Sequence, residues 1–123
     1  MSRKSFERRR AAEERWPTLY QFLAAYCHQD FPDFHGSLEG AIDAAIADYG
    51  LEDRQKVLRE WRDWNVEEGS QFDPRPAVNE GLGVAVMLNS PEDARHFMNM
   101  VYDKVVVSVR AETEAKWKPE WKR

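Results

Sequence analysis

The chain has 123 residues, 42% of them hydrophobic, which suits one domain with one modest core. It has no apolar run of about 18 residues, so a membrane-spanning helix is excluded, and its charged first 15 residues lack the apolar region of a secretory signal. Cys27 is the only cysteine, so no intrachain disulfide can form; this suits a reducing compartment, and we expect a cytoplasmic protein.

The net charge of −4 conceals a strong segregation of charge along the chain. Residues 1–15 carry six Arg or Lys and three Glu, whereas residues 16–50 carry five acidic residues and no Arg or Lys. The second block predicts an acidic surface. Such a surface repels nucleic acid and attracts basic partners, so it favours a protein partner over a polynucleotide.

The first elements in chain order are a charged segment and an amphipathic helix. We expect residues 1–15 to form a solvated helix outside a single helical domain of residues 16–123. Pro17 is suited to a first helical turn, and the helix predicted from there to His28 has one apolar stripe. Pro32 disfavours helical geometry in the residue before it and ends this element. The stripe comprises Leu19, Phe22, Leu23 and Tyr26.

Two further helices are predicted before residue 66. Ser37 has the character of an N-cap, and Gly50 stands where a helix often ends. The buried face between them comprises Leu38, Ala41, Ile42, Ala45, Ile46 and Tyr49. A third helix follows to about Asn65, with Trp64 at the edge of its inward stripe of Val57, Leu58 and Trp61. Because both connections are short, we expect the three helices to pack as antiparallel neighbours.

The remainder is predicted to be a loop and one more helix. Residues 66–90 contain several Gly and Pro and few apolar anchors, which is typical of a loop. Ser90 and Pro91 form a strong helix start, and a helix over 91–112 buries Ala94, Phe97, Met98, Val101 and Val105. The fold class is therefore mainly α, a bundle of about four helices. A small β element pairing 84–88 with 105–109 is the alternative, because residues 104–110 are rich in valine.

The residues that end the first helix raise the possibility of a metal-dependent enzyme. His28, Asp30, Asp33 and His35 are all potential ligands within eight positions. Recognisable metal sites usually have ligands on a rigid spacing, whereas these extend over a helix end and a proline-containing loop. The structural interpretation is that His28 binds the last helical carbonyls and the aspartates organise the turn. We expect no metal, cofactor or small-molecule ligand.

Two other functional readings are weaker. Cys27 lacks an obvious base, because the adjacent His28 points about 100° away on a helix. The arginines at 8–10 suggest binding of RNA or DNA, but glutamates interleave with them and the rest of the chain is acidic. We therefore expect no direct contact with nucleic acid, and deletion of residues 1–14 is the test of that alternative.

The stretch LYQFLAAYCHQDF at 19–31 resembles a signature of immunity proteins from bacterial contact-dependent growth inhibition systems. Cys27 stands where phenylalanine is usual and Phe31 where tryptophan is usual; both keep an apolar side chain. The segment AIADYGLED at 45–53 fits the family's next element, so the resemblance covers about residues 16–65. The matching positions, which we expect to be structural, are Leu19, Gln21, Phe22, Leu23, Tyr26, His28, Gln29 and Asp30.

The resemblance implies a protein that binds the C-terminal toxin domain of its cognate inhibition protein and blocks it without catalysis. The toxin is commonly a nuclease, whose basic cleft would complement an acidic immunity surface. Because immunity proteins must discriminate between toxins, we expect the contacts to lie outside the shared motif. The candidates are the acidic residues Asp33, Glu39, Asp43, Glu60 and Asp63 and the aromatic residues Phe34 and Trp64.

Overall fold

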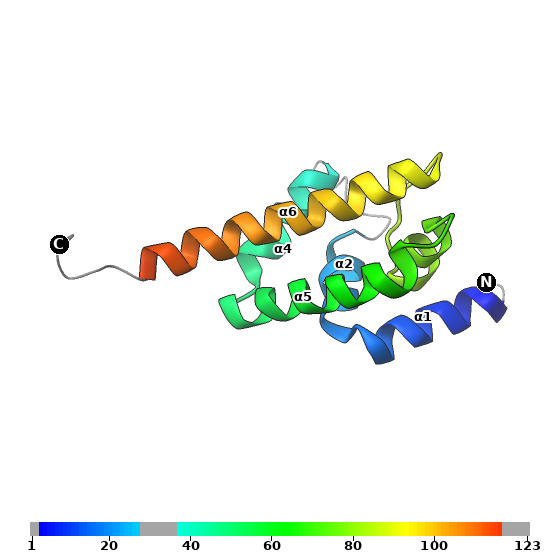
Figure 1. The fold of residues 1–123 in the computed structure, drawn as a ribbon, viewed down its shortest axis with the longest axis horizontal. Helices are drawn as coiled ribbons and strands as arrows, with labels where there is room; N and C mark the ends of the chain where they lie inside the picture. Colours follow the sequence, from blue (N-terminus) through cyan, green and yellow to red (C-terminus); the bar gives the residue numbers. More distant parts are fainter. Residues whose placement is uncertain (1–2, 28–36, 117–123) are drawn as a thin grey trace.

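The computed structural model describes residues 3–27 and 37–116, the last two without their side chains. The described residues form five α-helices and two short π-helical segments, and none of them is in a β-strand (Figure 1). The predicted mainly α class is thus confirmed. The alternative β element is wrong, because residues 84–88 are irregular and residues 105–109 belong to a long helix.

The charged N-terminal segment is helical and packs against the rest of the molecule. Helix α1 spans Arg3–Arg15, and Ala12 is its buried residue. The helix lies against the π-helical segment η2, Ala77–Gly81. Ser5 Oγ donates to Glu80 Oε1 at 2.7 Å, and Arg8 forms an ion pair with the same carboxylate. The burial of Ala12 and the contacts to Glu80 thus help to attach a mostly solvated helix.

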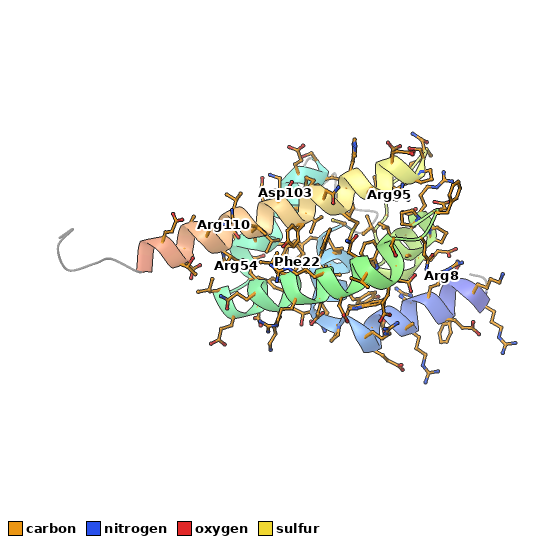
Figure 2. All side chains as sticks on the ribbon, viewed as in Figure 1. Arg8, Phe22, Arg54, Arg95, Asp103 and Arg110 are labelled. Atoms are coloured by element: carbon orange, nitrogen blue, oxygen red, sulfur yellow. The ribbon has the colours of Figure 1, made fainter. Side chains whose placement is uncertain are left out.

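Helix α2 spans Pro17–Tyr26 and provides the centre of the core. It ends one residue before Cys27, so it is shorter than predicted, and His28 lies outside the described residues. The predicted stripe is confirmed for Leu19, Phe22 and Leu23, which are fully buried, whereas Tyr26 is half-buried. Figure 2 shows Phe22 near the middle of the molecule.

The next two helices follow the prediction closely. Helix α4 spans Leu38–Asp48, and Ser37 Oγ accepts a hydrogen bond from the Gly40 amide at 3.0 Å, which confirms the N-cap. Helix α5 spans Leu51–Trp64. Gly50 does not end α4 as a left-handed glycine; its φ of −68° is ordinary, and it caps the start of α5. Helix α2 contacts both α4 and α5.

Residues 66–90 are more ordered than the loop predicted there. The π-helical segment η1, Asn65–Gly69, continues directly from α5, and η2 follows a short connection. Val78, Leu82 and Val84 are buried in the core. Asn79 Nδ2 donates to the carbonyls of Val84 and Val86, both at 2.8 Å, and so fixes the irregular backbone that follows η2. These contacts join η2 to an irregular segment and do not lie within one helix. A search for helical periodicity in the sequence therefore does not reveal them.

Helix α6 spans Pro91–Lys116 and runs beside α5, with its C-terminal end projecting beyond it (Figure 1). The Asp93 amide donates to Ser90 Oγ at 3.2 Å, as the predicted helix start requires. The helix continues past the expected end near residue 112. Its predicted inward residues, namely Ala94, Phe97, Met98, Val101 and Val105, are all buried.

A buried arginine ties the projecting half of α6 to α5. Arg54 is 6% exposed, and its guanidinium donates to the Tyr49 carbonyl at 3.0 Å and to Ser108 Oγ at 3.1 Å. It also forms an ion pair with Glu112. Valine side chains alone give little directional preference, whereas these hydrogen bonds specify the axial register of the two helices.

Candidate partner-binding surface

Helix α4 and the first turn of α5 present a run of exposed carboxylates. Between residues 37 and 53 the sequence has no Lys or Arg. The next basic residue, Arg54, is buried and paired with Glu112, so it adds no exposed positive charge. The exposed acidic residues of this run, which we call the acidic run, are Glu39, Asp43, Asp48, Glu52 and Asp53.

Two members of the acidic run have partners within the chain. Asp43 Oδ1 accepts from Lys104 Nζ at 3.0 Å, and Asp48 Oδ2 accepts from the Tyr26 hydroxyl at 2.6 Å. The hydrogen bond to Asp48, helped by burial, raises the pKa of Tyr26 to about 12. The remaining three, Glu39, Glu52 and Asp53, form no ion pair with any described residue. Their charge is available to a basic partner.

The candidate contact residues predicted from the sequence do not form a single patch. Glu39 and Asp43 lie on the exposed face of α4. Glu60 and Asp63 instead face α2: Glu60 Oε1 accepts from the Leu19 amide at 2.9 Å, and Asp63 Oδ2 accepts from the Trp16 indole at 3.4 Å. Glu60 thus satisfies an amide in the first turn of α2 that has no helical partner. Asp33 and Phe34 lie outside the described residues.

The expectation that Trp64 is an exposed aromatic residue is wrong. Its side chain is 2% exposed and belongs to the core. The π-helical turn of η1 carries Gly69 over the indole, so closely that a Cβ at Gly69 would lie 3.0 Å from Trp64 Cζ3. A helical projection of α5 alone places Trp64 at the edge of the apolar stripe. The projection does not include η1, the segment that covers the Trp64 indole.

The shared motif contributes mainly to the core where it is described. Leu19, Phe22 and Leu23 are buried, and the Tyr26 ring contacts Tyr49 edge-on with centroids 6.4 Å apart. Gln21 is exposed. The other motif positions, His28, Gln29 and Asp30, lie outside the described residues, and so does the candidate metal ligand His35. The predicted structural role of that helix end therefore stays a prediction.

The described residues provide little basis for catalysis. Over residues 3–27 and 37–116 no group of three or more His, Cys, Asp or Glu side chains is arranged to hold a metal ion. Cys27 is fully buried, and burial raises the pKa of its thiol to about 12. A thiol in that state is a poor nucleophile at neutral pH. None of the described helices is both long and apolar enough to cross a membrane.

The N-terminal arginines are engaged with acidic or phenolic groups of the same chain. Arg8 pairs with Glu80, and Arg10 pairs with Glu14 at 3.3 Å. Arg9 Nε donates to the Tyr20 hydroxyl at 3.0 Å, and this hydrogen bond raises the pKa of Arg9 further. The ion pairs of Arg8 and Arg10 with glutamates offset part of the positive charge that would otherwise attract phosphates.

Asp48, Glu52 and Asp53 complete the acidic run but were not among the candidates proposed from the sequence. The absence of Lys and Arg from 37 to 53 is the signal that could have found them, because it extends past the end of α4. The sequence shows where a basic residue interrupts a run of acidic residues. It does not show whether that basic residue is buried. Arg54, which ends the run, needed the structure to be recognised as internal.

A run of exposed carboxylates on a small helical scaffold is typical of a protein that binds a basic partner. Comparison with known protein families identifies the class of protein. The model of the CdiI immunity protein family matches residues 15–105. No curated protein and no solved structure gives a significant match. Because the match extends over most of its length, the chain belongs to the CdiI immunity protein family.

This membership confirms the resemblance seen at residues 19–31 and extends it into α6. The family consists of immunity proteins rather than enzymes, in agreement with the non-enzymatic role expected. Membership also implies a cognate toxin of contact-dependent growth inhibition as the partner.

Proposed function

We propose that the chain binds the C-terminal toxin domain of its cognate growth inhibition protein in the cytoplasm and neutralises it there. In this proposal the toxin is a nuclease, and the acidic run on α4 and α5 faces its basic cleft. The supporting observation is that all five acidic residues between residues 37 and 53 are exposed and that this stretch of sequence has no Lys or Arg.

The physical basis is competition for a surface that evolved to bind phosphates. A nuclease holds its substrate largely through Lys and Arg contacts to the phosphate backbone. A fixed array of carboxylates complements those side chains and blocks access to them. Complementary charge also accelerates encounter, which matters when a toxin must be captured before it acts. A specific complex of this kind buries on the order of 1,600 Å² in total.

We propose different roles for two groups of the predicted contact residues. We assign Glu39 and Asp43 to the toxin interface, together with Asp33 and Phe34 from the preceding segment. Glu60 and Asp63 are assigned to holding α2 against α5, because their carboxylates already accept hydrogen bonds from α2 and the residue before it. Trp64 belongs to neither group, since its indole is buried.

The experiment is a calorimetric and kinetic titration against the toxin domain encoded by the gene immediately upstream. That domain is co-expressed with the chain, separated from it in denaturant and refolded. We expect a one-to-one complex whose association rate falls as salt is raised, because exposed charges are screened over about 10 Å at 0.1 M salt. Absence of binding overturns the proposal.

Matched pairs of substitutions test the location of the interface. Glu39→Gln combined with Glu52→Gln removes two exposed charges of the acidic run, and Glu13→Gln combined with Glu14→Gln removes two exposed charges of α1. We expect the first pair to slow association about tenfold at low salt and the second to leave it within about twofold. Equal effects of the two pairs would show that the acidic run is not the contact surface.

A further inference from the structure

A shallow groove lies between α4 and α6, beside Asp43 of the acidic run. It encloses about 290 Å³ and is lined by Asp43 from α4 and by Asp103, Lys104 and Val107 from α6. Asp103 and Val107 are four residues apart, so they share one face of the helix. Figure 2 shows Asp103 on α6 and Arg110 further along the same helix.

The floor of this groove is apolar and open to solvent. Val107 is 65% exposed, although the valines around it at 101 and 105 are fully buried. A single exposed valine is common on protein surfaces and implies nothing by itself. Here, however, carboxylates from two different helices flank the valine, so an apolar surface and negative charge occur within one concave site.

The groove already accommodates one ammonium group. Lys104 Nζ lies 3.0 Å from Asp43 Oδ1, and the side chains of the two residues are 30% and 62% exposed. The Asp103 carboxylate, by contrast, has no hydrogen bond or ion pair with the side chain of any described residue. With Asp43 and Lys104 neutralising one another, the groove has a net charge of −1, so one monocationic side chain would balance it. Arg110, one turn beyond Val107 on α6, is exposed and does not line the groove.

We propose that this groove receives one lysine or arginine side chain of the toxin domain. Its aliphatic stem lies on Val107, and its cationic end binds Asp103 and shares Asp43 with Lys104. Long basic side chains bury their stems on apolar surface while keeping the charged end among polar groups. The inference rests on the proposed function and adds to it the chemistry of one contact. It also extends the interface from α4 to α6.

Lys104 allows a test in which a substitution is expected to strengthen binding to the toxin. In the complex this lysine competes with the incoming cation for Asp43. Replacing it with an uncharged residue of similar length should therefore leave the groove more negative and bind the toxin more tightly. If the pair of Lys104 and Asp43 served only to hold α4 against α6, the same replacement would weaken binding or leave it unchanged.

The test measures the dissociation constants of four variants with the refolded upstream toxin domain, after circular dichroism has shown native helix content. We expect Asp103→Asn to weaken binding about tenfold and Val107→Ser about threefold. Lys104→Gln should strengthen binding about threefold. The control is Glu92→Gln, which removes an exposed charge near the start of the same helix and should stay within twofold of the wild type.

The outcomes separate the inference from the function on which it rests. If the unsubstituted chain does not bind the toxin domain, the proposed function fails and the groove proposal fails with it. If it binds but Asp103→Asn behaves like Glu92→Gln, the toxin contacts another face and only the groove proposal is overturned. Hydrogen exchange of the unsubstituted complex gives an independent check, because slower exchange is expected around Asp43 and over 103–107. Unchanged exchange at both places would also overturn it.

Discussion

The substitution Arg54→Ala tests how far one buried side chain holds the helices of this fold together. Arg54 is 6% exposed and its guanidinium contacts three groups on two elements, the Tyr49 carbonyl, Ser108 Oγ and Glu112. Truncation to alanine removes all three contacts at once and leaves a space between α5 and α6. The predicted result is a folded but clearly destabilised chain.

The size of the stability loss in Arg54→Ala depends on which interactions the former partners of Arg54 can still form. Removal of one partner of a buried ion pair costs about 3–5 kcal/mol. Glu112 is 32% exposed, however, so water can solvate its carboxylate once Arg54 is gone. Ser108 Oγ keeps its hydrogen bond to the Val105 carbonyl at 2.8 Å. The expected loss therefore lies near the lower end of that range, about 3 kcal/mol.

Urea unfolding followed by tryptophan fluorescence and circular dichroism measures this loss as a change in midpoint at constant slope. Arg54→Met retains most of the packing and should recover part of the stability, which separates the hydrogen bonds from the filled volume. Arg59→Ala, an exposed arginine on the same helix, should change stability by less than about 0.5 kcal/mol. If Arg54→Ala matches Arg59→Ala, the reasoning from burial and hydrogen bonding is wrong.

Three further predictions concern the core and the attachment of α1. Trp61→Phe removes the buried hydrogen bond from the indole to the Met98 carbonyl (2.9 Å) and should cost about 1–3 kcal/mol in urea unfolding; a loss below 0.5 kcal/mol would contradict this. Cys27, with a thiol pKa of about 12, should resist Ellman's reagent at pH 8 until urea is added, and prompt reaction in the native state would refute its burial. The Glu80 carboxyl has a lowered pKa because Ser5 and Arg8 hydrogen-bond to it, so its stabilisation of the fold is present above its ordinary pKa of 4.5 and is lost as the pH falls below that value. Glu80→Gln should reduce the fall in melting temperature that occurs as the pH is lowered below 4.5. An unchanged fall would refute the role given to the Glu80 carboxylate.

The helices could be predicted where one segment contains both its periodicity and its cap. Ser37 and Ser90 each precede an apolar stripe and accept the hydrogen bond expected of an N-cap. The choice between helix and strand at 104–110 was settled by packing. Val101 and Val105, one helical turn apart, are both buried, whereas Val107 is exposed; a strand would place Val105 and Val107 on the same face, so this pattern fits the helical stripe and not the strand.

The segment from 65 to 90 escaped prediction because its order depends on distant partners. Val78 and Leu82 are buried although glycine and proline surround them in the sequence. Helix α1 covers this segment from outside, through contacts between residues more than 70 positions apart. No local pattern contains that information. The burial of Trp64 was missed because a helical projection of α5 does not include η1, which folds Gly69 over the indole.

The candidate site was predictable in its charge but not in its division of roles. The absence of Lys and Arg from residues 16–50 correctly indicated exposed acidic residues at 39 and 43. The sequence could not show that the carboxylates at 60 and 63 face α2, because both positions look solvent-exposed on a single helix. Only the packing of α2 against α5 shows that these two carboxylates already accept hydrogen bonds from α2 and the residue before it.

The separation of buried and exposed positions on helix α4 bears on how new toxin–immunity pairs could arise. Its inward residues Ala41, Ile42 and Ala45 are buried, while Glu39 and Asp43 point outward from the same short helix. Substitutions at exposed positions usually change stability by less than about 0.5 kcal/mol, whereas changes in the core cost several times more. The outward positions can therefore diversify over successive generations at little risk to folding. A lineage can explore new recognition chemistry here without first acquiring compensating mutations in the interior.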